Sequence, residues 1–267
     1  SLSYVPIPDT DWTRMHSSLR AAASTYARFH VVRSVFRRCT DSTNYGLTSL
    51  SIQSLRGFSV ESNERIAGTS PSIFPPQVES RIRWILKLMG YYSRESVLIR
   101  NAKVIFAGMR KQASRPEFHA IGLGTTPTTE FSIVTLHMWM YFARLRSEGE
   151  DGKNLQKELF ILFMQYVDKL IRNSPGVKTF LISKFVRECQ TAFYSSCLVY
   201  DEAVLESDSV LASALWRYTF AEAGRSQDLA SILLYVRREL ANQRNSPLQV
   251  MVNGEYKYSV PDPNSTN

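Results

Sequence analysis

The chain has 267 residues, of which 44% are hydrophobic and 21% charged, so it can build a large core and is not disordered by composition. Its formal net charge is +8, and two acid-poor stretches, residues 13–40 and 80–116, carry the positive excess. This asymmetry indicates an anionic partner, while only 12 glycines favour helices over a parallel α/β enzyme and three cysteines exclude a disulfide framework.

Residues 1–40 are predicted to form a basic N-terminal arm, with a helical pattern over residues 14–38. The pattern is rich in Arg and Ser and free of acids, which is typical of a mitochondrial transit peptide and equally of a basic surface helix, so both interpretations stay open. The chain begins with Ser1 rather than Met, so we expect its true start to lie upstream. Ser, Thr and Pro predict a linker over residues 41–77.

Residues 78–242 are predicted to fold as one all-α domain of about six or seven helices, because apolar residues recur there with helical spacing. Ser93 is the expected N-cap of one helix, and the stretch EFSIVTLHMWMYFARL, apolar nearly all round, is the expected central helix. The longest apolar run is too short to span a membrane, so we expect a peripheral rather than a transmembrane protein. Residues 243–267 are predicted to form a tail in which Asn253-Gly254 turns a short β-hairpin.

No recognisable catalytic motif occurs in the sequence, so we expect no enzyme activity, no cofactor and no metal site. His137 is expected to be a hydrogen-bonded core residue, and Cys189 and Cys197 are expected to be buried or free thiols. Adjacent Asp201 and Glu202 point about 100° apart on a helix, so they cannot act together on one substrate. Their expected role is to close that helix.

Trp216 and Arg217 leave two alternatives open. In the first, Trp216 packs at the edge of the core and Arg217 extends to solvent or pairs with an acid such as Asp201, which would clamp two helices together. In the second, the two side chains form part of a surface that binds a partner.

Two blocks of the sequence, LHMWMYFARLRSEG and YDEAVLESDSVLASALWRYTF, resemble the ubiquinol–cytochrome c chaperone family. The resemblance is specific in these blocks, thinner over residues 78–125, and absent from residues 1–70 and from the tail after residue 242. The signature residues that carry it are His137, Trp139, Arg144, Arg146, Tyr200, Asp201, Glu202, Leu211, Ala212, Ala214, Leu215, Trp216 and Arg217.

The resemblance implies an all-helical, non-catalytic mitochondrial protein, in the matrix or associated with the inner membrane. Members of the family are assembly factors of the cytochrome bc1 complex that act near the mitochondrial ribosome, with a small partner protein and newly made cytochrome b. The arm, the linker and the hairpin depart from the family, so assembly of the mitochondrial ribosomal large subunit, through ribosomal RNA and ribosomal or assembly proteins, stays open as an alternative.

The second basic stretch supplies candidate contacts to ribosomal RNA. Its apolar faces should turn inward, which would leave the cations on a shared outer surface facing phosphates. A solvated face without a partner is the alternative for the same residues. The candidates are Arg81, Arg83, Lys87, Arg94, Arg100, Lys103, Arg110, Lys111 and Arg115.

Overall fold

The structure, a computed structural model, describes residues 93–174, 177–220 and 225–262, and every regular element in these ranges is a helix. The prediction of an all-α domain is therefore confirmed, and no helix in these ranges is long and apolar enough to cross a bilayer. The predicted arm and linker lie outside the described residues, as do Arg81, Arg83 and Lys87. The longer helices are α4 (Arg94–Ala113), α6 (Pro127–Leu145), α7 (Gly149–Arg172), α8 (Ile182–Leu205), α9 (Asp208–Tyr218) and α10 (Ser226–Asn245); the short elements are α5 (Glu117–Ala120), α11 (Leu248–Asn253) and the 3-10 turns η2 (Arg146–Glu148) and η3 (Thr179–Leu181).

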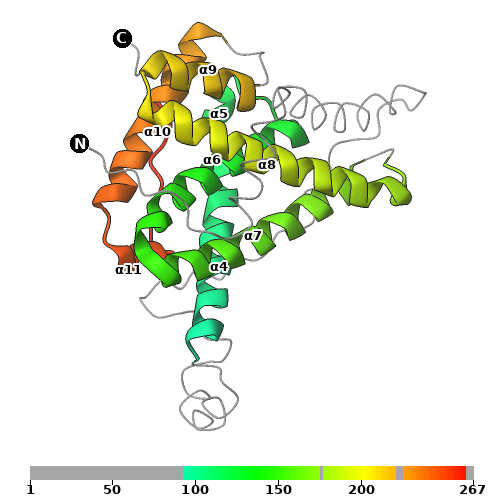
Figure 1. The fold of residues 1–267 in the computed structure, drawn as a ribbon. Helices are drawn as coiled ribbons and strands as arrows, with labels where there is room; N and C mark the ends of the chain where they lie inside the picture. The colour runs from blue at the N-terminus through cyan, green and yellow to red at the C-terminus, as the bar shows by residue number, and fades with distance from the viewer. Residues whose placement is uncertain (1–92, 175–176, 221–224, 263–267) are drawn as a thin grey trace.

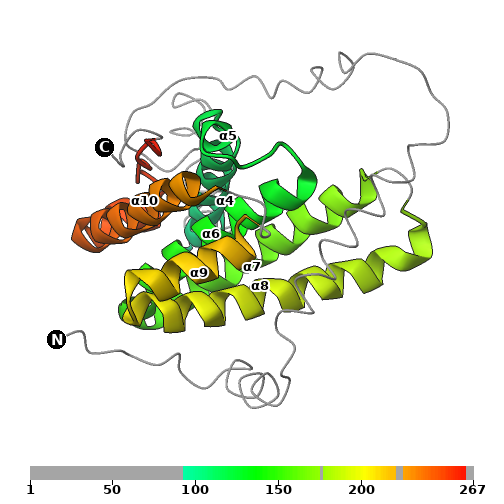
Figure 2. The ribbon, with the colours of Figure 1, turned by 90° about the horizontal axis from the view of Figure 1, so that it is seen from above.

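Helix α6 is the centre of the domain, because α4, α7, α8 and α10 all pack against it (Figures 1 and 2). Every residue from Phe131 to Phe142 is buried. A helix that is apolar on all sides must be covered on all sides, so composition alone dictates this position. The prediction of a central buried helix is confirmed.

The starts of α4 and α6 are fixed by side-chain caps. The Ser93 hydroxyl accepts a hydrogen bond from the Ser96 backbone N–H at 3.2 Å, which confirms the predicted cap of α4. The Thr126 hydroxyl accepts from the Thr129 N–H at 3.2 Å, and Pro127 is the first helical residue of α6. Each cap satisfies a backbone donor that the helix itself leaves unpaired.

Helices α7 and α8 run antiparallel as a long hairpin (Figures 1 and 2), and aromatic side chains form much of their contact. The ring centroids of Phe163 and Phe193 lie 4.8 Å apart, and Phe160 stacks on Tyr194 at 5.2 Å. Cys189, on the same helix as Phe193, is buried, in agreement with the expectation of a core thiol. After α8, the chain folds back as α9, which packs between α8 and α10.

The predicted C-terminal hairpin is wrong. Residues Leu248–Asn253 form α11, and Gly254 at φ 75° ends that helix as a left-handed C-cap. Asn-Gly suits a tight β-turn and a helix end equally well, because both need positive φ at the glycine. A Cβ on Gly254 would lie 2.9 Å from Val104 Cγ1, so the end of α11 is pressed directly against α4.

Beyond Gly254 the chain continues without regular structure to residue 262 and is tied to α4 and α10. The fully buried Glu239 carboxylate accepts hydrogen bonds from the Tyr256 hydroxyl at 2.8 Å and from the Ser259 backbone N–H at 2.9 Å. Gln112 on α4 donates to the Ser259 carbonyl oxygen at 2.7 Å. The segment that was expected to be a tail is thus packed on the domain, on the side that carries α10 (Figure 1).

Candidate partner-binding site

Four signature residues lie at positions 137, 139, 144 and 146, on α6 and the turn that follows it. Residues two apart in a helix point about 200° apart, whereas residues seven apart share one side. His137 and Arg144 should therefore face one side of α6, with Trp139 and Arg146 facing the other. The first pair contacts α10 and the second pair contacts α8.

His137 is part of a buried chain of hydrogen bonds that joins α6, α10 and α4. Its Nδ1 lies 2.7 Å from the Ile133 carbonyl oxygen, its Nε2 lies 2.7 Å from the Tyr235 hydroxyl, and Gln112 donates to that hydroxyl at 3.1 Å. Because a carbonyl only accepts, Nδ1 carries the proton and Nε2 accepts from the tyrosine. Burial lowers the pKa of His137 to about 4, so the imidazole is neutral near pH 7. His137 is the hydrogen-bonded core residue that was predicted.

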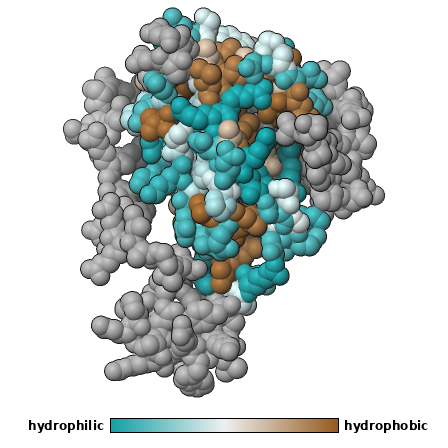
Figure 3. Space-filling model, turned by 90° about the vertical axis from the view of Figure 1, so that its left-hand side faces the viewer, coloured by the Kyte–Doolittle hydropathy of each residue, from teal (hydrophilic) through white to brown (hydrophobic). Residues whose placement is uncertain are grey.

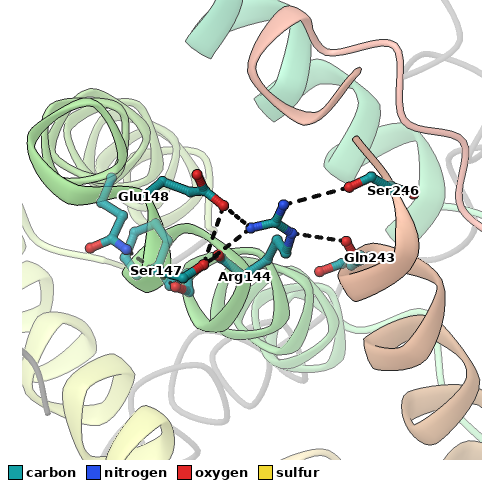
Figure 4. Close-up of polar contacts among 7 residues, drawn as sticks. Arg144, Ser147, Glu148, Gln243 and Ser246 are labelled. Atoms are coloured by element: carbon teal, nitrogen blue, oxygen red, sulfur yellow. Dashed lines mark hydrogen bonds and ion pairs between the residues drawn. The ribbon is translucent and has the colours of Figure 1, made fainter. Parts of the chain in front are cut away.

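Arg144 joins the end of α6 to the end of α10 (Figure 4). Its guanidinium donates from Nε to the Gln243 carbonyl oxygen at 3.0 Å, lies 3.5 Å from the Ser246 carbonyl oxygen, and pairs with Glu148. The last carbonyls of a helix lack partners within the helix and carry partial negative charge. A cation placed there satisfies them, so Arg144 acts in this structure as a capping group for α10.

Trp139, Arg146 and Asp201 form a buried ion pair and hydrogen-bond set that we call the α6–α8 clamp. The Trp139 indole N–H donates to Asp201 Oδ1 at 2.7 Å, and Arg146 donates to both carboxylate oxygens at 2.8 and 2.7 Å. Asp201 is only 8% exposed, so these two partners replace the water that the carboxylate loses. The predicted pairing of Asp201 with Arg217 is replaced by a pairing with Arg146.

Tyr200 extends the clamp toward α9. Its ring centroid lies 5.0 Å from that of Trp139, and its hydroxyl lies 2.9 Å from the Thr219 hydroxyl just after α9. Burial raises the pKa of the Tyr200 phenol far above its ordinary value, and the hydroxyl stays protonated. Tyr200 and Asp201 therefore lie inside the α8 helix and hold three helices together.

The remaining polar signature residues face outward. Glu202 and Arg217 are exposed, and Trp216 is partly buried against the core at its edge. The apolar signature positions split as well: Leu211, Ala214 and Leu215 are buried, while Ala212 is half-buried. The motif thus has an internal part, which positions the helices, and an external part on α8 and α9.

Glu202 and Arg217 meet in a groove between α8 and α9 of about 550 Å³, which we call the α8–α9 groove. Glu202, on α8, and Glu206, which caps the end of that helix, are the acids of the α8 wall, and Arg217 lies on the α9 wall. The other lining residues have small or apolar side chains. The lining residues are Val199, Glu202, Ala203, Glu206, Ser209, Val210, Ser213, Ala214 and Arg217. The lining thus combines two acids, one cation and several small or apolar side chains, a composition that suits an amphipathic helical protein segment.

The basic candidates on α4, with Arg115 just after it, fall into two groups. Arg94 pairs with Asp151, and Arg100 and Arg115 are half-buried. Lys103, Arg110 and Lys111 are exposed, and the Arg110 guanidinium lies 4.8 Å from the centroid of the Tyr166 ring. Residues 103 and 110 are seven apart and share one side of α4, so a basic outer strip exists on this helix.

Comparison with known protein families identifies the family of this chain. Residues 119–258, which include both sides of α6, the clamp and the groove, match the family described as Ubiquinol-cytochrome C chaperone. The chain belongs to this family. The match extends to residue 258, so the expectation that the resemblance ends before the tail is wrong: the segment after α11 packs on α10 and is part of the family fold.

Named relatives agree with the family assignment. The chain is 27% identical over 176 residues to mouse Ubiquinol-cytochrome c reductase complex assembly factor 1, covering 62% of this chain and 59% of that protein. It is 25% identical over 137 residues to Protein CBP3, mitochondrial, of Saccharomyces cerevisiae, covering 49% and 40%. The crystal structure of the Cbp3 homolog from Brucella abortus has the same fold, with a TM-score of 0.58, 20% identity, and coverage of 68% of this chain and 99% of that one. The chain spans about three fifths of the mammalian relative that it matches.

Sequence reasoning missed Glu206 in the groove and Glu239 under the C-terminal segment. A signal for Glu206 was available, because it is an acid that closely follows Glu202 at the end of the same predicted helix. Glu239 gave no such signal, because a glutamate in a predicted helix is normally expected to face solvent. Its burial depends on a donor distant in the sequence, the Ser259 backbone N–H, which only the structure reveals.

Proposed function

We propose that the protein is a non-catalytic mitochondrial assembly factor for the cytochrome bc1 complex. The observation that carries the proposal is the family match over residues 119–258, together with relatives named as assembly factors of ubiquinol–cytochrome c reductase. The yeast relative is named as a mitochondrial protein, which supports a mitochondrial location. We place the protein in the matrix, peripheral to the inner membrane.

The proposal makes the α8–α9 groove the docking site of a small soluble partner protein of the assembly factor. The proposed occupant is an amphipathic helix that sets a basic side chain against Glu202 and Glu206, an acid against Arg217, and a row of small apolar side chains against the other lining residues. A transmembrane segment of a nascent membrane protein fits less well, because it would bury the two carboxylates without partners. The charge pattern therefore selects the soluble partner.

A non-catalytic role agrees with the surroundings of the two adjacent acids. Both carboxylate oxygens of Asp201 are bonded to Trp139 and Arg146, whereas Glu202 lines the α8–α9 groove. The two acids therefore offer no shared acid–base site. His137 has both ring nitrogens engaged inside the core. These residues contribute to structure rather than to a reaction.

Depletion of the protein tests the proposed function directly. We expect the assembled bc1 complex and newly synthesised cytochrome b to fall, while other respiratory complexes are assembled normally. Re-expression of the wild-type chain should restore both. Normal levels of bc1 complex and cytochrome b after complete depletion would refute the proposal.

We further propose that the exposed strip on α4 contacts ribosomal RNA, and this contact would hold the protein near the mitochondrial ribosome. Three cations, Lys103, Arg110 and Lys111, are exposed there. Each phosphate that they neutralise should steepen the fall of log affinity with log salt by about 0.7–0.9. Replacing all three by Gln should release the protein from ribosomal particles in a sedimentation experiment, whereas unchanged co-sedimentation over a salt series would remove the RNA contact from the account.

A further inference from the structure

The end of the α7–α8 hairpin presents the most exposed large apolar side chain in the described residues. Phe180, in the 3-10 turn η3, is 75% exposed, and the next most exposed large apolar residue, Leu205, reaches 52%. Figures 1 and 2 show that the first turns of α8 project at the edge of the domain. On the side that carries α10, in contrast, polar residues divide the apolar ones into separate patches (Figure 3).

Basic residues are frequent in the sequence on both sides of Phe180. Lys178 and Lys184 lie two residues before and four residues after it, and both are exposed. The sequence from 168 to 188 contains five basic residues, Lys169, Arg172, Lys178, Lys184 and Arg187, against two acids, Asp168 and Glu188. Asp168 is already paired with Arg172 at 2.6 Å, and Glu188 is half-buried two turns along α8. The end of the hairpin therefore carries a net positive charge and one exposed apolar side chain, Phe180.

We propose that this hairpin tip, defined as residues Val177–Lys184, binds an anionic lipid bilayer with the Phe180 ring inserted among the headgroups. An aromatic ring is favourable at the depth of the headgroups, and lysines beside it are attracted to anionic lipids. Val177 and Leu181, close to Phe180 in the sequence, are partly buried against the core, whereas the Phe180 ring remains at the surface. A single projecting aromatic side chain can insert into a bilayer surface. Single-stranded nucleic acid, in contrast, is bound along a positively charged groove.

The tip and the α8–α9 groove lie at opposite ends of α8. Residue 202 is twenty residues along the helix from its start at Ile182, which corresponds to roughly 30 Å. A protein held by the tip would present the groove away from the membrane, where a soluble partner can reach it. The membrane contact does not depend on the proposed function, because it is measured with lipids alone.

Vesicle flotation of the purified chain tests the proposal. We expect binding to vesicles that mix phosphatidylcholine with phosphatidylglycerol, and weak binding to phosphatidylcholine alone. Lys178→Gln and Lys184→Gln should each lower the partition coefficient about fivefold, and Phe180→Ser at least about tenfold. Leu205→Ser, at the other end of α8, and Lys257→Gln, an exposed lysine after α11, are the matched controls and should bind like the wild type.

A second variant measures the depth of the aromatic ring in the bilayer. Phe180→Trp should bind anionic vesicles as the wild type does, and its added fluorescence should shift to the blue and be quenched by lipids brominated near the headgroup. The proposal is overturned if Phe180→Ser floats like the wild type, if binding is equal with and without anionic lipid, or if the tip variants lose binding to an RNA oligonucleotide while vesicle binding is unchanged. Circular dichroism of each variant confirms that exposed substitutions leave the helices intact.

Discussion

Asp201 and Glu202 are neighbours on α8, yet they belong to two regions with opposite surroundings. Asp201, in the α6–α8 clamp, is 8% exposed and accepts hydrogen bonds from Trp139 and Arg146. Glu202 is exposed and lines the α8–α9 groove together with Arg217. One sequence motif therefore combines residues that fix the packing of helices with residues that are available to a partner. Measurements of stability and of partner binding should separate the two.

The largest expected effect is the loss of the clamp. Asp201→Ala leaves the Arg146 guanidinium and the Trp139 indole N–H buried without their acceptor, which should cost about 3–5 kcal/mol of unfolding free energy. The matched variant Glu202→Ala, one residue along, should cost less than about 0.5 kcal/mol. Urea denaturation of both variants measures the difference, and equal costs would show that the clamp and the groove are not distinct regions.

Lowering the pH should weaken the opposite side of α6. His137 has a pKa of about 4 in the folded protein and an ordinary value of 6.5 when unfolded, so the unfolded chain takes up the proton first as the pH falls. Its contribution to stability is therefore complete above pH 6.5, is lost progressively down to about pH 4, and amounts to about 3 kcal/mol.

Denaturation at a series of pH values checks this expectation, with His137→Gln as the control. The variant should be less stable than the wild type at pH 7 but should lose the part of the pH dependence that the wild type shows between these two pKa values. A wild-type profile that the substitution leaves unchanged would contradict the buried neutral imidazole.

Trp216 lies at the border between the core and the surface, so its substitution can affect both stability and partner binding. It is partly buried against the core, so Trp216→Ala should cost about 2 kcal/mol, less than the 3–5 kcal/mol typical of a fully buried aromatic. Thermal unfolding and pull-down of the partner should be measured on the same variant. Unchanged unfolding with lost binding would reassign Trp216 from a packing residue to an interface anchor.

The smallest effect on stability is expected in the groove. Glu202→Gln with Glu206→Gln removes two exposed charges, so the unfolding free energy should change by less than about 0.5 kcal/mol. Partner affinity should fall about tenfold, since a helix with a facing cation loses both carboxylates. Calorimetric titration measures the affinity, and an unchanged value would exclude the α8 wall from the interface.

The sequence predicted the fold better than it predicted the contacts. Helical spacing and the apolar composition of residues 131–142 were enough to place α6 at the centre, because burial on every side is a property of one segment. The hairpin error has the same local origin: Asn253-Gly254 favours positive φ, but whether a helix or a strand precedes it depends on packing against Val104 on α4.

The clamp could be predicted only in part. The motif residues were identified, but the partner of Asp201 was expected to be Arg217, close in sequence, whereas it is Arg146, 55 residues away. Long-range pairs depend on how helices cross, and one sequence without a structure does not specify that. The sequence indicated only polar residues of the groove and not the groove itself. The groove forms only when α9 folds back on α8.

The role of the groove in assembly is tested in cells in which the endogenous chain is replaced by a Glu202→Arg/Glu206→Arg variant. We expect the variant to accumulate to normal levels and fold, to lose its small partner protein, and to leave the bc1 complex strongly reduced on native gels. Glu255→Arg, an exposed acid outside the groove, is the control and should support normal assembly. A normal amount of bc1 complex with the double variant would contradict the central claim that the α8–α9 groove carries the assembly function.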